Sequence, residues 1–261
     1  MPAPPPTPAA PDATHLVYKN THQLSMTLKE PTFFKLLYFP IHSNGATIRE
    51  ILSIAGAKWE NLVPGDWEKE KEKTPFNVLP VLFITSLTNK DVILAEAGVI
   101  EQYLAKQFEL LGSNEYEENL IKSFHSSTAS LYSLHATTVA FIPDREARKR
   151  AMEVFRDGPF RAWVTLHEKH LRDNGSNGHY VGDKLTLADI RTANLIEHMN
   201  LQTGGQALYD IINRSPCLRK LRAEVAFDYR VSGWRSSQAY KALTTVTDQY
   251  FSDPFAPASK L

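Results

Sequence analysis

Two short stretches carry residue types that can bind a small peptide. In the first, Pro80 lies within the apolar run 78–82, although proline donates no hydrogen bond to a sheet and its ring fixes φ. The simplest explanation is a strand that begins at Pro80 after a sharp turn, for example through a cis Leu79-Pro80 bond, which leaves the Leu79 backbone unpaired. Such an open backbone edge can bind a short peptide by strand-like pairing.

The second stretch is Glu96-Ala97, where the pattern predicts the start of a helix. It follows an apolar strand over residues 91–95. After it, apolar residues recur at the spacing of one helix face, namely Val99, Ile100, Tyr103 and Leu104. Because the first N–H groups of a helix have no partner within it and the helix dipole is positive there, this position favours a carboxylate.

The elements that position these two stretches follow from the same patterns. Residues 33–39 form an aromatic and aliphatic run between prolines, which suits a buried strand. A turn at 42–45 leads to a helix with an apolar face, and a strand over 59–63 and a polar crossover come next. We therefore expect the order β-α-β-(short α)-β-β-α, with a parallel strand pair and an antiparallel hairpin.

The two stretches together carry a family resemblance. NVLPVL (77–82) followed by LAEAGVIEQYLA (94–105) resembles the glutathione-binding half of cytosolic glutathione transferases, of the Tyr-type, sigma-like kind and closest to fungal members. The resemblance implies an α/β thioredoxin-like domain followed by an all-α helical bundle. It also implies that Leu79, Pro80, Glu96 and Ala97 bind glutathione, with Glu96 accepting from the γ-glutamyl ammonium.

Ala97 departs from the family pattern, which has a serine at this position. The serine hydroxyl would donate to the γ-glutamyl carboxylate. Loss of one hydrogen bond to a charged group costs about 1.5 to 3 kcal/mol, so glutathione affinity would fall roughly tenfold to a hundredfold. The Ala97 N–H and the helix dipole remain, so weak glutathione binding is compatible with the sequence.

Tyr38, at the end of the first strand, is the catalytic candidate that the resemblance implies. It matches the tyrosine that hydrogen-bonds to the glutathione sulfur in Tyr-type members. A phenol directed at a sulfur stabilises the thiolate, which is the reactive nucleophile. The alternative role for Tyr38 is that of an ordinary core aromatic residue.

Four further candidates also depend on the resemblance. Trp67 and Lys71 precede Pro80 at the spacing with which sigma-type members bind the glycine carboxylate, although WEKEKEK alone would be a solvated charged face. Where relatives often have an arginine-containing turn, this chain has His42 and Asn44. We include both as neighbours of the sulfur site, while a lone histidine is usually a packing or surface residue.

The sequence from Glu115 onward is helical in pattern and predicts a separate bundle. Long amphipathic segments cover 115–142, 144–173 and 215–229, and Gly158-Pro159 can kink the second. Thr186 and Asp189 have the spacing of a capping box, a feature of the family's C-terminal domain. In relatives, Tyr132, His135 and Phe141 would line an apolar acceptor pocket, and each could equally belong to the core.

These patterns give four segments. We predict a disordered proline-rich tail at 1–30, a thioredoxin-like domain at 31–111, a helical domain at 112–248 and a tail at 249–261. Six of the first eleven residues are prolines, and such a segment cannot bury enough surface to offset its ordering entropy. The resemblance covers about 33–234.

Composition excludes several classes of protein. Basic and acidic residues number 29 each, so no overall field attracts nucleic acid or anionic lipid. The single cysteine, Cys217, excludes an internal disulfide, a CxxC redox pair and a cysteine-based zinc site, and we predict no metal. No membrane span and no secretory signal are expected. The last residues, Ser259-Lys260-Leu261, predict a peroxisomal location, with the cytoplasm as the alternative.

The sequence thus leads to two functional hypotheses. The first is a glutathione-dependent transferase that adds the activated thiol to an apolar, unsaturated small molecule. Addition could end in a conjugate, or reverse after bond rotation and isomerise a double bond. Analogy with fungal members implies that the reaction is a step in natural-product biosynthesis. The second is a non-catalytic binding or structural protein of the same fold, which Ala97 and the altered turn after Tyr38 motivate. Family membership implies a homodimer.

Overall fold

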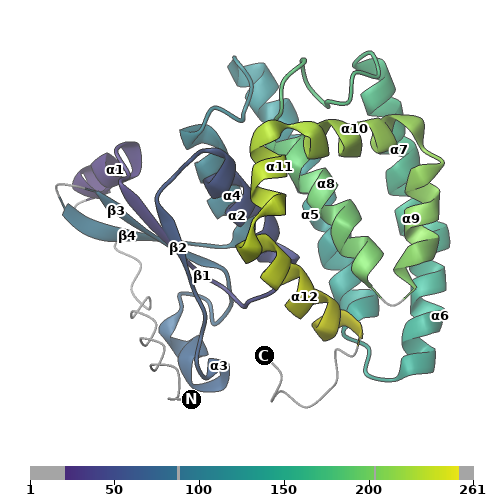
Figure 1. Cartoon of the computed structure of the whole chain (residues 1–261), viewed down its shortest axis with the longest axis horizontal. Coiled ribbons are helices and arrows are strands. Elements are labelled where there is room, and N and C mark those ends of the chain that lie inside the picture. The colour runs from purple at the N-terminus through teal and green to yellow at the C-terminus, as the bar shows by residue number, and fades with distance from the viewer. Residues whose placement is uncertain (1–20, 87–88, 203, 253–261) are drawn as a thin grey trace.

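The computed structural model describes residues 21–86, 89–202 and 204–252. A small sheet with its helices forms one side of the molecule, and a bundle of helices forms the other (Figure 1). This architecture confirms the predicted fold class, an α/β thioredoxin-like domain followed by an all-α domain.

The sheet has four strands in the order β2-β1-β3-β4. These strands are β1 (Phe33–Leu37), β2 (Trp59–Leu62), β3 (Val81–Ser86) and β4 (Asn89–Ala95). β1 and β2 are parallel, whereas β3 is antiparallel to both β1 and β4. The predicted parallel pair and antiparallel hairpin are therefore confirmed, with a helical crossover between the parallel strands as their geometry requires.

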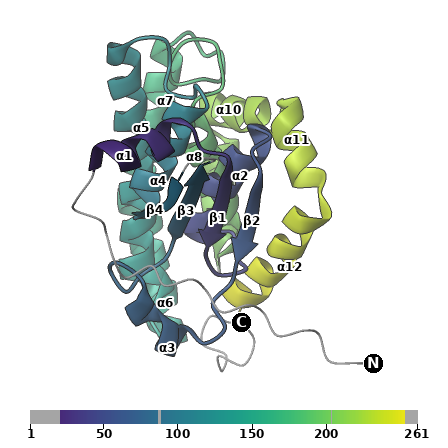
Figure 2. The same ribbon diagram turned by 90° about the vertical axis from the view of Figure 1, so that its left-hand side faces the viewer.

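Two helices, α2 (Ala46–Ile54) and α4 (Ala97–Gln107), cover the face of the sheet that is turned toward the bundle (Figure 2). Because side chains alternate along a strand, every second residue of β1 and β3 reaches this face. The resulting core joins Phe34, Leu36, Leu82 and Ile84 of the strands with Ile48, Ile51, Leu52, Ile100 and Leu104 of the helices. A smaller cluster of Leu37, Val81 and Phe83 lies on the opposite face.

A helix that the sequence analysis did not predict precedes the sheet. α1 (Thr21–Lys29) packs against β3 and β4, with Thr27 buried. The Tyr103 hydroxyl donates to the Leu28 carbonyl at 3.0 Å. The prediction of disorder up to residue 30 is therefore wrong for this segment, because tertiary contacts stabilise a helix whose own periodicity is weak. The proline-rich residues 1–20 lie outside the described residues.

The bundle consists of eight labelled α-helices in the described part of the chain. They are α5 (Glu115–His135), α6 (Arg145–Phe155), α7 (Arg161–Asp173), α8 (Leu187–Leu201), α9 (Gly205–Asn213), α10 (Pro216–Phe227), α11 (Tyr229–Ser236) and α12 (Gln238–Ser252). Short π-helical segments, η3 (Ala136–Ala140) and η4 (Arg156–Phe160), follow α5 and α6. Pro159 lies within η4, so the helix changes its hydrogen-bond pattern at the predicted Gly158-Pro159 break.

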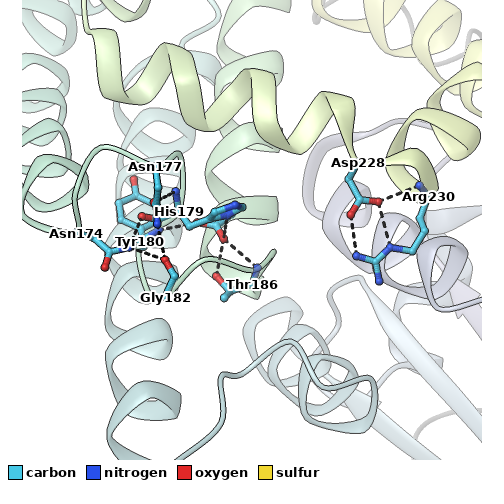
Figure 3. A network of polar contacts seen from close by, with 9 residues as sticks. Asn174, Asn177, His179, Tyr180, Gly182, Thr186, Asp228 and Arg230 are labelled. Carbon is cyan, nitrogen blue, oxygen red and sulfur yellow. Dashed lines mark hydrogen bonds and ion pairs between the residues drawn. The ribbon is translucent and has the colours of Figure 1, made fainter.

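The predicted capping box starts α8. The Thr186 N–H and hydroxyl each donate to Asp189 Oδ2 at 2.9 Å. The second carboxylate oxygen accepts from the Tyr180 N–H at 2.9 Å, and His179 Nδ1 lies 3.2 Å from Oδ2. Figure 3 shows His179, Tyr180 and Thr186 gathered at the start of this helix. The buried carboxylate thus fixes the loop before α8 and carries out a folding role, as predicted.

The last two helices fasten the bundle to the sheet domain. Arg235 of α11 donates to Glu50 of α2, with Nε and Oε2 separated by 2.9 Å. α12 continues to Ser252, so residues 249–252 belong to a helix and not to the predicted tail. Residues 253–261, including Ser259-Lys260-Leu261, lie outside the described residues. None of the helices in the described part of the chain is long and apolar enough to cross a membrane.

Candidate active site

Strand register brings the two peptide-binding stretches to the same end of the strands, which forms one margin of the sheet and is called the sheet edge below. Leu37 of β1 pairs with Val81 of β3, and Val81 in turn pairs with Ala95 of β4. Tyr38 follows Leu37, the cis Leu79-Pro80 bond precedes Val81, and Glu96 follows Ala95. These residues therefore meet at the same end of the strands, although they are far apart in the chain. Helix α3 lies beyond this end (Figures 1 and 2).

The Leu79-Pro80 stretch has the backbone arrangement that the sequence predicted. The Leu79-Pro80 bond is cis. The pairing of β3 with β1 and β4 begins at Val81, so the Leu79 backbone takes no part in either ladder. Its N–H and C=O are thus available to a peptide that runs along the edge of the sheet.

Glu96 and Ala97 form the start of α4. Glu96 is exposed and has a φ of 71°, in the left-handed region that is unfavourable for residues other than glycine. Such strain costs about 1 to 3 kcal/mol and is typical of ligand-binding positions. Its carbonyl accepts from Val99 and Ile100 at 3.1 and 3.0 Å. Helix geometry leaves the N–H groups of Ala97 and Gly98 without partners within α4, so they can bind a carboxylate.

Tyr38 is buried at the end of β1, and its hydroxyl has polar partners. The Asn44 backbone N–H donates to it at 3.2 Å, and the Ser43 side chain belongs to the same turn. Burial raises the pKa of Tyr38, although the polar groups of Ser43 and Asn44 and the charges of Arg49 and Arg191 oppose the rise. The phenol is therefore neutral near pH 7 and can donate its proton to a sulfur anion.

The turn after β1 is held together by Arg49, which the sequence analysis did not identify. This buried side chain donates to the carbonyls of Ile41 and Phe39 at 2.6 and 2.7 Å, and to Asn61 at 2.9 Å. Burial lowers the pKa of Arg49 to about 10, so it still carries its charge at neutral pH. In the sequence, the only indication of this buried role was one arginine among the apolar positions of a helix, ATIREILSI.

Gly45 is required where this turn passes Tyr38. A Cβ at Gly45 would lie 2.6 Å from Tyr38 Cδ1 and 2.7 Å from an Arg49 guanidinium nitrogen. Both neighbours are buried and fixed by hydrogen bonds. A larger residue would therefore displace the tyrosine or the arginine that orients its turn.

His42 and Asn44, the two residues predicted near the sulfur, have different contacts. The His42 N–H donates to Thr247 of α12 at 2.8 Å, its Nε2 lies 2.9 Å from Thr244 Oγ1, and its ring packs on Tyr240. Burial lowers the pKa of His42 to about 4. The histidine side chain thus packs against α12, whereas Asn44 reaches Tyr38 through its backbone.

Trp67 and Lys71 lie in and just after the short helix α3 (Trp67–Glu70). The Trp67 ring centroid is 5.6 Å from that of Phe39, which in turn is 5.8 Å from that of Tyr38. This row of rings brings α3 to the Tyr38 end of the sheet. Lys71 Nζ is 2.6 Å from Glu68 Oε2 in a largely exposed pair, so a bound carboxylate would compete with Glu68 for the Lys71 charge.

Of the three residues predicted for the acceptor pocket, the structure brings one to Tyr38. Tyr132 of α5 has its hydroxyl 2.5 Å from Ser43 Oγ, and the Arg191 guanidinium lies 5.3 Å from its ring centroid. His135 is buried against Phe155, and this burial lowers its pKa to about 4. Phe141 is 61% exposed. Ser43 and Arg191 are further members of this cluster that the sequence analysis did not assign.

Comparisons with known proteins agree with this architecture. Residues 133–238 match the family model described as glutathione S-transferase, C-terminal domain. The chain is 31% identical over 166 residues to probable glutathione S-transferase 7 of Caenorhabditis elegans, an alignment that covers 61% of this chain and 77% of the relative.

Two solved structures illustrate the same fold. A sigma class glutathione S-transferase of Fasciola hepatica has a TM-score of 0.68 and 22% identity, covering 79% of this chain and 98% of the other. A glutathione S-transferase of the hookworm Necator americanus, described as monomeric, has a TM-score of 0.66 and 24% identity, covering 79% and 97%.

Proposed function

This chain belongs to the glutathione S-transferase family, and from this premise we propose that it is a Tyr-type, sigma-like transferase that activates the glutathione thiol. The observation that carries the proposal is the neutral, buried Tyr38 hydroxyl, placed at the sheet edge that also presents Leu79 and the start of α4. One group can stabilise a sulfur anion there while the others bind the peptide.

The proposed binding mode assigns a role to each edge residue. Leu79, which precedes cis-Pro80, pairs its backbone with the cysteinyl part of glutathione. The N–H groups at Ala97 and Gly98 bind the γ-glutamyl carboxylate, and Glu96 accepts from the ammonium. Trp67 and Lys71 bind the glycine carboxylate at the other end. The missing hydroxyl at Ala97 makes this binding weaker than in relatives with serine by about tenfold to a hundredfold.

The proposed chemistry begins with loss of the thiol proton to solvent, while the Tyr38 hydroxyl donates a hydrogen bond to the resulting thiolate. The sulfur then forms a bond to an electrophilic carbon of an apolar, unsaturated substrate, and the displaced electron pair of the double bond takes up a proton. Without that protonation, rotation about the former double bond and loss of the sulfur give an isomer. Conjugation and isomerisation thus use the same activated sulfur.

By analogy with fungal members, we also propose that this reaction is a step in natural-product biosynthesis. Product analysis with unsaturated substrates separates the two reactions, since only conjugation consumes glutathione. Recovery of stable conjugates alone would remove the isomerase variant.

The predicted peroxisomal location is tested by comparing a fluorescent fusion of the full chain with one that lacks Ser259-Lys260-Leu261.

The central experiment is a glutathione titration of the wild type and Tyr38→Phe, following binding heat and the ultraviolet absorbance of the thiolate. We expect the variant to bind glutathione with the thiolate signal lost and kcat/KM lowered about 100-fold to 1000-fold. Tyr116→Phe, which changes an exposed tyrosine of α5, is the control. Wild type that binds glutathione without forming thiolate would contradict the proposal.

The second candidate function is a non-catalytic binding or structural protein of this fold. Ala97, which removes a hydroxyl from the carboxylate site, is the observation that favours it. This function predicts that Tyr38→Phe leaves every property other than stability unchanged. The same titration therefore separates the two candidates.

We propose a homodimer as the assembly. Phe76, Val78 and Val99 are exposed apolar side chains in segments next to the glutathione edge, with exposures of 54%, 44% and 54%. A second copy of the chain would cover such side chains. Sedimentation at micromolar concentration tests this assembly, and a monomer, like the Necator americanus relative by its description, would contradict it.

A further inference from the structure

A groove on the helical domain lies away from the candidate active site. It runs between α6 and the start of α9, on the side of the bundle that faces away from the sheet (Figure 1). Its volume is about 450 Å³, which is within the range of small-molecule sites, about 300 to 1000 Å³. None of its lining residues belongs to the proposed glutathione site.

The apolar part of the groove comes from both helices. Met152 of α6 is only 8% exposed, and Gly204 and Ala207 line the groove from the start of α9. A Cβ at Gly204 would lie 3.5 Å from Met152 Cγ, so the two helices approach each other closely here. A methionine side chain is flexible and polarisable and adapts to apolar ligands of different shapes. This part of the groove therefore suits an apolar chain.

The charged part of the groove comes from α6. Its cationic side chains are Arg145, Arg148, Lys149 and Arg156, and its carboxylates are Glu146 and Glu153. Asp157 neutralises Arg156, with its carboxylate oxygens 2.8 and 2.5 Å from Nε and NH2. Within the part of the chain that the structure describes, Arg145 and Lys149 have no ion-pair partner. The end of the groove at Arg145 thus holds three cations and one carboxylate.

The placement of these cations conflicts with the electrostatics of α6 itself. Arg145 and Lys149 are four residues apart, so they lie side by side on the helix surface and repel each other. Arg145 is also the first residue of α6, where the positive end of the helix dipole disfavours a cation. Such local conflicts are expected where function requires them. An anion bound between the two side chains would remove the conflict.

We propose that this groove binds an amphipathic carboxylate, a molecule with one anionic head group and an apolar chain, such as a fatty acid. The head group lies between Arg145 and Lys149, and the chain lies along Met152 and Ala207. A guanidinium binds a carboxylate through two parallel hydrogen bonds, and an ammonium adds a point charge. Because the groove is separate from the glutathione site, this inference does not depend on the proposed function.

The test is a calorimetric titration of the full-length protein with dodecanoate below its micellar concentration. Acetate has the head group without the chain, and dodecyltrimethylammonium has the chain with the opposite charge. The variants are Arg145→Gln, Lys149→Gln and Ala207→Glu, the last of which places a carboxylate in the groove. Arg150→Gln is the matched control, because it removes an exposed cation of α6 that does not line the groove.

We expect dodecanoate to bind the wild type at least about tenfold more tightly than either control ligand does. Arg145→Gln and Lys149→Gln should each weaken dodecanoate binding about twofold to fivefold, as for exposed ion pairs. Ala207→Glu should weaken it more, by about tenfold or more, because its carboxylate repels the head group and displaces the chain. Arg150→Gln should bind dodecanoate as the wild type does, and glutathione affinity should be the same in every variant.

Thermal unfolding gives a second readout, which depends on the charge conflict in α6. Without a ligand, Lys149→Gln should raise Tm by about 1 to 2 °C, because the repulsion from Arg145 is gone. With saturating dodecanoate the order of the two proteins should reverse, since the wild type binds the ligand more tightly and gains more stability from it.

Three outcomes would overturn the inference. If the groove variants bind dodecanoate as the wild type does, the ligand lies elsewhere, for example in the acceptor pocket. If acetate binds as tightly as dodecanoate, the cations attract small anions only and the apolar part has no role. If the wild type binds phosphatidylserine vesicles but not free dodecanoate, the groove faces a lipid surface and does not hold a single molecule.

Discussion

The two ends of the candidate site are built in different ways. At the sulfur end, Tyr38, Arg49 and their hydrogen-bond partners are buried and fixed. At the two carboxylate sites, which are together called the carboxylate end, Glu96 of the first is exposed and Lys71 of the second forms a largely exposed pair with Glu68. Buried polar groups resist rearrangement because leaving one unpaired is costly, whereas exposed groups exchange partners readily. The Tyr38 hydroxyl, which would act on the sulfur, is thus held rigidly, whereas the groups that would bind the carboxylates can change their positions.

The largest effect is expected from removing the side chain that holds the sulfur end. Arg49→Met leaves the buried carbonyls of Phe39 and Ile41 without their donor. We expect a loss of about 3 kcal/mol in the free energy of unfolding, and loss of thiolate formation because the Tyr38 turn is no longer fixed. Urea unfolding measures the first and thiolate absorbance the second. Arg150→Met, on the exposed side of α6, is the control.

If Arg49→Met keeps both its stability and its thiolate signal, the sulfur end is not held by buried contacts. The contrast between the two ends would then lose its physical basis. A loss of stability with the thiolate signal retained would limit the role of Arg49 to folding.

The next effect concerns the carboxylate end. Ala97→Ser adds the hydroxyl that the family pattern has at the start of α4, and we expect glutathione affinity to rise about tenfold to a hundredfold. The pKa of the bound thiol should stay the same, because the sulfur end is unchanged. Calorimetry measures the affinity, with Ala55→Ser at an exposed position as the control. An affinity gain below threefold would show that the N–H groups alone suffice.

How much of this site the sequence predicts differs between its two ends. Leu79-Pro80, Glu96 and Ala97 were found because a proline inside an apolar run and a helix start are local signals. Ser43 and Tyr132 are 89 residues apart, and no local pattern links them. Arg49 gave a weak signal, since a buried arginine and an exposed one look alike in a helical sequence. Local sequence patterns therefore did not predict the contacts between segments that are distant in the chain.

The fold shows the same division. The order of strands and helices along the chain, and the longer helices of the bundle, followed from periodicity and from turn residues, since each of these elements has its own apolar pattern. α1 was missed because it depends on the sheet and on the Tyr103 hydroxyl. His42 was placed near the sulfur by the family resemblance, yet its backbone and its side chain both bond to α12, more than 200 residues later.

A third prediction tests whether His42 belongs to the rigid part of the molecule. Burial lowers its pKa from 6.5 to about 4, so the unfolded chain binds a proton that the folded chain does not between these values. Stability is therefore lost as pH falls from about 6.5 toward 4, and His42 accounts for about 2 kcal/mol of the loss between pH 7 and pH 5.

The measurement is the free energy of unfolding at pH 7 and pH 5 for the wild type, His42→Gln and His22→Gln. His42→Gln should show the smaller loss on acidification, because glutamine does not titrate. His22 is exposed on α1, so its variant should keep the wild-type dependence. Equal acid sensitivity in all three proteins would mean that His42 is accessible to water, which would place it in the adjustable part of the structure.

The smallest effect is expected at the exposed pair beside Trp67. Glu68→Gln removes the carboxylate that competes for Lys71, whose pKa the Glu68 hydrogen bond raises. Because water screens an exposed pair and its side chains are mobile, glutathione affinity should improve only about twofold to fivefold. Calorimetry at two salt concentrations should show the gain shrinking at high salt, with Glu115→Gln as the control. A gain as large as that of Ala97→Ser would mean that Lys71 is held as firmly as Arg49, and that the two ends do not differ in rigidity.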